Sequence, residues 1–137
     1  MGLNAGKGQV YHHNMVHTLT AYIDSNSAAT VSLGWLPSGA AVIGSGVSVF
    51  APWSGIGIEA VDLGFRNSEE GYTADPNAFT ETILGLDVAI GHIAGDVVSA
   101  ANKYFSEPAE AIATITNTNS TTGAALVYVT YVVREVA

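Results

Sequence analysis

The chain has 137 residues, of which 48% are hydrophobic and 12% charged, and its formal net charge is -8. With twelve Asp and Glu against four Lys and Arg, the chain is too negative to neutralise phosphates. Neither nucleic acid nor an anionic membrane is therefore an expected partner. The chain has no cysteine, which excludes disulfides and thiolate metal sites, and its length predicts one domain. No apolar run approaches the roughly 18 residues that span a bilayer. The polar N-terminus does not resemble a signal peptide, which favours synthesis and retention in a cytoplasm.

Residues 1–15 are polar and rich in glycine, without the pattern of a core-forming element. We expect them to form an extended N-terminal arm that contacts a partner, ahead of a single domain over residues 16–137. The expected contact residues in the arm are Lys7, Gln9, Tyr11, His13 and Met15.

The histidines of this region suggest a metal site only at first sight. His12, His13 and His17 lie within six residues of one another. On a strand, His13 and His17 would be about 13 Å apart at ~3.3 Å per residue. This distance is too long for sharing one ion, and no cofactor or metal is expected.

The rest of the chain favours β-structure. Val, Ile and Thr together number 36, whereas Leu numbers 8 and Lys 2, a bias typical of sheets. Runs of apolar residues between turn signals predict about eight strands in an all-β fold, a β-sandwich or jelly roll. The expected strands are Met15–Ile23, Thr30–Leu36, Ala41–Phe50, Ile56–Phe65, Leu84–Ile90, Val97–Tyr104, Ala111–Thr116 and Ala124–Val133.

Two segments leave room for one or two short helices. Asp75 followed by Pro76 is a typical helix start, which predicts one or two helical turns over Asp75–Glu81. Apolar residues in Ala94–Tyr104 fit helical spacing as well as a strand, and both interpretations stay open.

Turn and strand patterns make further predictions. Pro37-Ser38-Gly39 predicts a tight hairpin, and Gly44 and Gly46 predict a bulge or bend in the strand that follows. Trp35, in an alternating strand, is expected in the core. The polar stretch 114–123 is interpreted as a strand end and an exposed hairpin loop.

The final strand alternates clearly. Its odd-numbered residues from Ala125 to Val133 are expected on one face and its even-numbered residues on the other. Both faces are apolar or aromatic, so we expect this strand to be central and covered on both sides.

Catalytic and metal-binding signals are weak. Asp62, Glu69, Glu70 and Asp75 form an acidic segment without calcium-loop spacing, and a solvated loop is the simpler interpretation. Pairing of Glu59 with Glu107 or Glu110, as in glycosidases, has no distinguishing spacing. No nucleophile elbow or phosphate-binding glycine motif is found. We therefore do not expect an enzyme.

An alternative function is a calcium-dependent carbohydrate-binding module. Aromatic rings offer stacking surfaces for sugars, and Trp35, Trp53, Tyr11, Tyr22 and Tyr72 supply such rings. In this alternative, Trp53, Tyr72 or Tyr104 would stack on the sugar, and the acidic segment would hold calcium.

The segment Gly34–Ile43, with its Leu-Pro-Ser-Gly-Ala turn, resembles the small β-sandwich proteins that cement or decorate the capsids of tailed bacteriophages. The likeness continues at Asp62–Phe65, at Ala74–Phe79 and in residues 113–132. It implies a jelly-roll-like fold, a homotrimer, attachment to the major capsid protein on the virion surface, synthesis in the host bacterium and no catalysis. Trp53 and Tyr72 are then expected near subunit contacts. A phage tail or fibre domain is a further alternative, since these also use trimeric sandwiches.

Overall fold

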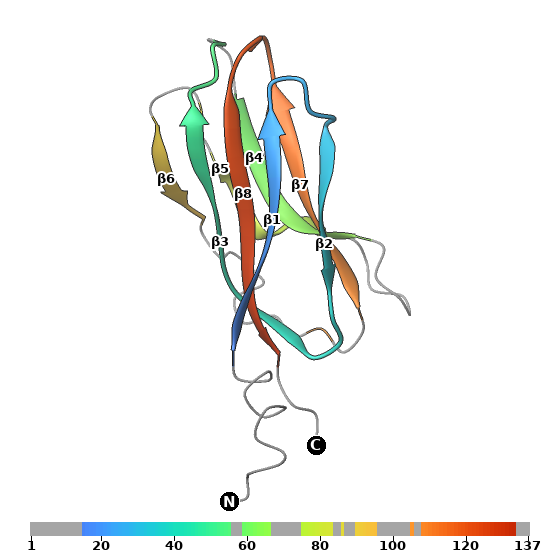
Figure 1. Ribbon diagram of the computed structural model, residues 1–137. Helices are drawn as coiled ribbons and strands as arrows, with labels where there is room; N and C mark the ends of the chain where they lie inside the picture. The colour runs from blue at the N-terminus through green and yellow to red at the C-terminus, as the bar shows by residue number, and fades with distance from the viewer. Residues whose placement is uncertain are drawn as a thin grey trace, which may run out of the picture.

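The computed structural model describes residues 15–55, 59–66, 75–83, 86, 90–95, 105 and 108–133. These residues form eight strands in two facing antiparallel sheets, and no helix (Figure 1). None of the described residues belongs to a helix that could cross a membrane. The strands are β1 (Val16–Asp24), β2 (Thr30–Leu36), β3 (Ala40–Ala51), β4 (Glu59–Arg66), β5 (Asp75–Ile83), β6 (Gly91–Ala94), β7 (Ala109–Asn117) and β8 (Ala124–Val133).

The strand order identifies the sandwich as a jelly roll. One sheet has the order β1-β8-β3-β6 and the other β2-β7-β4-β5. Strand β1 pairs with β8, β2 with β7, β3 with β6 and β4 with β5, all antiparallel. The chain is therefore one long hairpin that turns between β4 and β5 and is then rolled, so that β3 meets β8 and β4 meets β7. This arrangement confirms the expected all-β sandwich of about eight strands.

Two expectations about the middle of the chain were wrong. Asp75–Ile83 is strand β5, not a helical turn. β5 lies at the edge of its sheet among the described strands, where Pro76 near the strand start removes no central ladder bond. Pairing with β4, in which Phe65 opposes Asp75, outweighs the local helix-start signal. Leu86 lies in a turn rather than a strand.

The segment that follows forms the short strand β6, which was not expected as a separate strand. β6 includes Ala94. The segment Ala94–Tyr104, for which both a helix and a strand were considered, therefore begins in a strand. Residues 96–104 lie outside the described residues.

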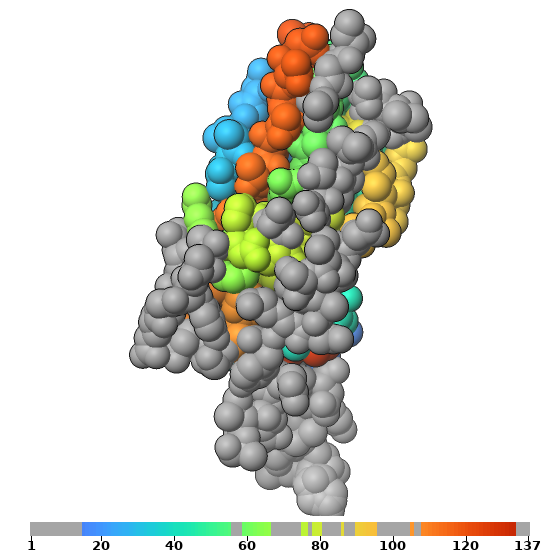
Figure 2. All heavy atoms as spheres, turned by 180° about the vertical axis from the view of Figure 1, so that it is seen from behind, coloured from blue at the N-terminus to red at the C-terminus, as the bar shows by residue number. Residues whose placement is uncertain are grey.

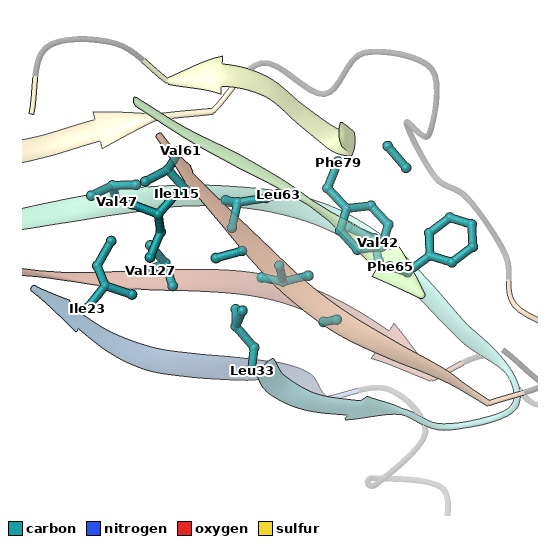
Figure 3. Packing of buried hydrophobic residues seen from close by; sticks show 14 of the residues in the cluster. Ile23, Leu33, Val42, Val47, Val61, Leu63, Phe65, Phe79, Ile115 and Val127 are labelled. Atoms are coloured by element: carbon teal, nitrogen blue, oxygen red, sulfur yellow. The ribbon is translucent and has the colours of Figure 1, made fainter. Parts of the chain in front are cut away.

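The core lies between the sheets and changes character along its length. Val47, Val61, Ile115 and Val127 meet in one part, and Phe65 and Phe79 lie near Val42 in another (Figure 3). Strand β8 supplies Ala125, Val127, Val129 and Tyr131 to the core, all buried, which confirms the predicted alternation. Its even-numbered residues are only half-buried, so the described chain does not cover its outer face as expected.

A bulge in β3 exchanges the faces of that strand. The pairing with β8 shifts between Val42 and Gly44, with Ile43 as the extra residue. Val42 is buried before the shift and Ser45, Val47 and Val49 after it. Inward positions thus change from even to odd, as a one-residue insertion requires. The bulge predicted from the glycines is confirmed.

Trp35 is not a core residue. Its side chain is 50% exposed, whereas Leu33 and Leu36 are buried. The pairing of β2 with β7 shifts between Ser32 and Gly34, and Gly34 has a φ of 120°, a conformation open to glycine. Simple alternation fails at this irregularity, and Trp35 turns outward.

The two predicted hairpin loops instead carry the chain from one sheet to the other. The Ala40 N–H donates to the Pro37 carbonyl at 3.1 Å, and Gly39 has a φ of 90°, which confirms a tight turn. It connects β2 to β3, which belong to different sheets. Likewise, residues 118–123 connect β7 to β8 across the sandwich, and Ser120 in this loop is buried.

Candidate interaction surfaces

The outer face of the β1-β8-β3-β6 sheet, called the neutral face below, is almost free of charge. Its four strands contain one Asp, Glu, Lys or Arg, which is Asp24 at the end of β1. Along the β1–β8 pair the outward side chains are Val16 and Val132, Thr18 and Thr130, Thr20 and Tyr128, and Tyr22 and Leu126. Figure 1 views the molecule from this side, and no described segment lies over these strands.

Exposed apolar side chains concentrate on the same sheet. Seven large hydrophobic residues are exposed among the described residues, and Trp35 in β2 is the exception in belonging to the other sheet. The other six lie in β1 or β3 or directly before β1 or β6: Met15, Val16, Tyr22, Ile43, Phe50 and Ile90. Exposed apolar side chains gathered on one sheet in this way are typical of a contact site.

Tyr128 organises the middle of the neutral face. Its ring lies over Gly46, because a Cβ at Gly46 would come within 2.6 Å of Tyr128 Oη. Tyr128 Oη is hydrogen bonded to His92 Nε2 at 2.5 Å, and the two rings stack with centroids 5.6 Å apart. The absence of a side chain at Gly46 thus lets Tyr128 lie flat across β3 towards β6, which gives this face a defined surface.

The outer face of the β2-β7-β4-β5 sheet, called the charged face below, has a different chemistry. The described charged side chains of its strands are Asp62, Arg66, Asp75 and Glu110, together with Glu59, which is buried. Arg66 Nε donates to Glu110 Oε1 at 3.0 Å, with the two residues opposite each other on β4 and β7. Figure 2 shows the molecule from this side, with β5 in yellow-green near its middle. The strands of the two sheets therefore differ in charge, although outward positions such as Ala60 and Ile112 on the second sheet are buried.

The predicted contact residues are placed as follows. Met15 is 52% exposed beside the neutral face, whereas Trp53 is 2% exposed and belongs to the core. Trp53 is therefore not an exposed contact residue in this structure. The arm residues Lys7, Gln9, Tyr11 and His13 lie outside the described residues, as does Tyr72.

The residues considered for metal binding or acid–base chemistry have structural contacts. His17 stacks on Tyr131 with ring centroids 5.3 Å apart. Glu59 is buried, and its Oε1 accepts the N–H groups of Thr118 and Asn119 at 3.2 and 3.4 Å. Glu59 and Glu110 lie at opposite ends of the β4–β7 pair, so they do not form a carboxylate pair. Within the described ranges no three His, Asp or Glu side chains gather around a common metal position.

Of the aromatic residues in the carbohydrate alternative, the two that the structure describes as exposed lie on different sheets. Tyr22 belongs to β1 and Trp35 to β2, on different sheets. The segment 67–74 and Tyr104, which the carbohydrate alternative needs, lie outside the described residues.

Sequence reasoning missed the neutral face, although one signal for it was present. Residues 40–51, 91–94 and 124–133 contain no Asp, Glu, Lys or Arg. Counting charges strand by strand would have marked these segments. That they join β1 in one sheet follows only from the topology.

Comparison with known proteins relates the fold to phage capsids. No protein-family model and no curated protein matches the chain. A chain in the acidic stable capsid of Helicobacter pylori bacteriophage KHP30 has a TM-score of 0.62 and 22% identity, covering 91% of this chain and 93% of that one. A chain in the cyanophage Pam1 capsid has a TM-score of 0.64 and 13% identity, covering 86% and 84%. One in the capsid of Ralstonia phage GP4 has a TM-score of 0.59 and 15% identity, covering 88% and 86%. The resemblance to phage capsid proteins noted in the sequence is thus confirmed at the level of the fold.

Proposed function

We propose that this protein is a non-enzymatic structural protein of a phage virion that cements or decorates the capsid by bridging major capsid protein subunits. The observation that carries the proposal is the likeness to three phage capsid chains, which extends over 86% or more of this chain. Because this chain shares its fold with the three capsid chains over nearly its full length, a structural role in a capsid is the simplest proposal for it.

The surface chemistry supports a role in assembly. The outer face of the β1-β8-β3-β6 sheet, with its exposed apolar side chains and one charged residue, is suited to contact with another protein. The proposed assembly is a homotrimer on the outside of the capsid, formed after synthesis in the bacterial cytoplasm. The arm of residues 1–15, with Met15 exposed at its end, is proposed to contact a neighbouring copy or the capsid.

The test is reconstitution with capsids that lack this protein. Purified protein is mixed with such capsids, the mixture is sedimented, and bound protein is measured against concentration. We expect saturable binding with a fixed ratio to the major capsid protein. Failure to bind would overturn the proposal, and binding to purified phage tails or fibres, or to glycans only when calcium is present, would favour an alternative.

A variant lacking residues 2–14 tests the arm separately. This deletion stops before β1 and leaves the sandwich strands intact. We expect weaker binding to capsids with unchanged thermal unfolding. Unchanged capsid binding would refute the proposed role of the arm.

A further inference from the structure

We infer that the end of the sandwich where β4 begins binds a hard divalent cation, of which Ca²⁺ fits best, with the buried Glu59 as its charged ligand. We call this the Glu59 site and define it by Glu59, Asn119 and Ser120, whose oxygens gather over Gly55. The inference goes beyond the proposed function and does not depend on it. It uses none of the acidic residues to which calcium was assigned in the carbohydrate alternative.

The carboxylate of Glu59 is satisfied only in part by the described residues. Glu59 is 2% exposed, and its Oε1 accepts the N–H groups of Thr118 and Asn119. Its Oε2 is buried, and no described residue is hydrogen bonded to it. Arg66 is the one Lys or Arg among the described residues, and it pairs with Glu110 at the other end of β4. Because buried charges are normally paired or bound to a metal, an unsatisfied buried carboxylate oxygen indicates an ion at this position.

Oxygen atoms of other side chains lie beside Glu59 Oε1. A Cβ at Gly55 would lie 2.7 Å from Glu59 Oε1 and from Ser120 Oγ, and closer still to Asn119 Oδ1. The three oxygens therefore surround one small region, which the missing side chain of Gly55 leaves to them. They come from a carboxylate, a hydroxyl and an amide, and such oxygen ligands are those that Ca²⁺ takes in proteins. An all-oxygen set favours Ca²⁺ over softer metals such as zinc.

The arrangement also suits the coordination habits of Ca²⁺. Ser120 Oγ accepts the Gly55 N–H at 2.7 Å, and a hydroxyl oxygen has a second lone pair for a cation. Ca²⁺ accepts irregular geometry and takes part of its shell from water, whereas Mg²⁺ requires a near-ideal octahedron. With a formal net charge of -8, the chain as a whole attracts cations.

A cation in the Glu59 site would connect segments that are distant in sequence. Gly55 follows β3, Glu59 begins β4, and Asn119 and Ser120 belong to the loop that crosses from β7 to β8. Strands β3 and β8 belong to one sheet and β4 and β7 to the other. The cation would therefore hold the two sheets together at this end, and the folded chain would gain stability from binding it.

Calorimetric titration of the wild-type protein with calcium chloride is the first test. With one carboxylate among the ligands, we expect one site with a dissociation constant on the order of 10⁻⁴–10⁻³ M. Calcium at about ten times this dissociation constant should raise the melting temperature by about 3–6 °C. Sodium chloride of equal ionic strength should not, which separates binding from screening of the net charge.

Three variants locate the site. E59Q keeps the shape of the side chain but removes its charge, and we expect it to weaken calcium binding by about tenfold or more. N119D adds a second carboxylate and should tighten calcium binding by about tenfold. D62N is the matched control, because it removes the same charge elsewhere on β4, on the charged face, and should leave the calcium affinity unchanged.

The variants also distinguish ligation from a purely structural role of Glu59. Asn119 is exposed, so N119D tests the site even if E59Q does not fold, and a structural contact would not bind calcium more tightly. Equal calcium affinities of E59Q and the wild type, or no tightening in N119D, would overturn the inference. A wild-type protein that neither binds calcium nor melts at a higher temperature with it would overturn it as well, and would make water the partner of Glu59 Oε2.

Discussion

At the end of the sandwich where β4 finishes, three phenylalanine rings meet, whereas at the end where β4 begins, loops are joined by hydrogen bonds. Phe105 lies edge-on to Phe65 and Phe79, with centroids 5.0 and 6.0 Å away. The Phe105 backbone also exchanges hydrogen bonds of 2.7 and 2.8 Å with Gly39 and Ala40. We call this the aromatic end.

The opposite end, called the polar end below, contains few large rings and many directed contacts. Gly55 N–H donates to Ser120 Oγ at 2.7 Å, and Asn117 Nδ2 donates to the Ser25 carbonyl at 2.9 Å. Ser54 Oγ accepts from Thr121 and Thr122 at 3.0 and 3.2 Å. Apolar contacts have little directionality, whereas hydrogen bonds depend on orientation. The aromatic end should therefore respond to lost volume, and the polar end to single methyl or hydroxyl groups.

The largest effect is expected at the aromatic end. Phe79 is fully buried, and F79A would leave a cavity between the sheets. We expect the free energy of unfolding to fall by about 3–5 kcal/mol, measured by urea denaturation. W35A removes a larger but half-exposed ring and should cost far less. Similar losses in the two variants would show that this end is not held by buried ring volume.

At the polar end, Gly123→Ala tests steric closeness against a matched glycine. Gly123 and Gly91 have φ values of 143° and 142°. A Cβ at Gly123 would lie 2.6 Å from Trp53 Cδ2, whereas one at Gly91 would meet no atom of the described residues within 4 Å. Both substitutions carry backbone strain, but G123A should cost about 1–3 kcal/mol more in unfolding free energy. Equal costs would mean that Trp53 adjusts freely.

Ser120→Ala tests the hydrogen bonds of the polar end. It would leave the buried Gly55 N–H without its acceptor, and we expect a loss of about 1–3 kcal/mol. Ser32 accepts from Gly34 N–H at 3.2 Å in an exposed position, so S32A should change stability by no more than about 0.5 kcal/mol. If both variants melted at the wild-type temperature, this end would not depend on directed bonds.

The smallest effect concerns pH. Burial raises the pKa of the Tyr131 phenol above its ordinary value of 10.0. The unfolded chain then loses this proton at lower pH than the folded chain, so the contribution of Tyr131 to stability declines as pH rises above about 10. Between pH 9 and 11, Y131F should lose less stability than the wild type, with Y22F as the exposed control. Parallel pH profiles for Y131F and the wild type would contradict this expectation.

Sequence patterns were informative where one period continued without interruption. In β8 the alternation of residues predicted the strand and the division of its side chains into two sets. It did not show which set is inward, because both sets are apolar or aromatic, and the expected cover on both faces was wrong. The same rule failed at Trp35, because the register shift between Ser32 and Gly34 changes which residues face inward. Gly34 is the only local sign of this shift, and a single glycine does not locate a bulge by itself. The Asp75-Pro76 signal failed because pairing with β4 is a contact distant in sequence.

Local sequence patterns also could not predict which turns connect the two sheets. Pro37-Ser38-Gly39 has the same turn chemistry whether the next strand pairs with the last one or crosses to the other sheet. The neutral face depends on that same choice, since β1, β3, β6 and β8 come from four separate parts of the chain. The low charge of each of these strands could therefore be read from the sequence. That the strands lie together in one sheet could not.

The rolled topology has a consequence for synthesis of the chain. β8 is the last described strand in sequence, yet it lies between β1 and β3 in the middle of its sheet. While the ribosome is still making the preceding residues, β1 and β3 lack the strand to which both are bonded in the finished molecule. The sheet can therefore close only after β8 has emerged, and a nascent chain that stalls earlier exposes two unpaired strand edges to other nascent chains.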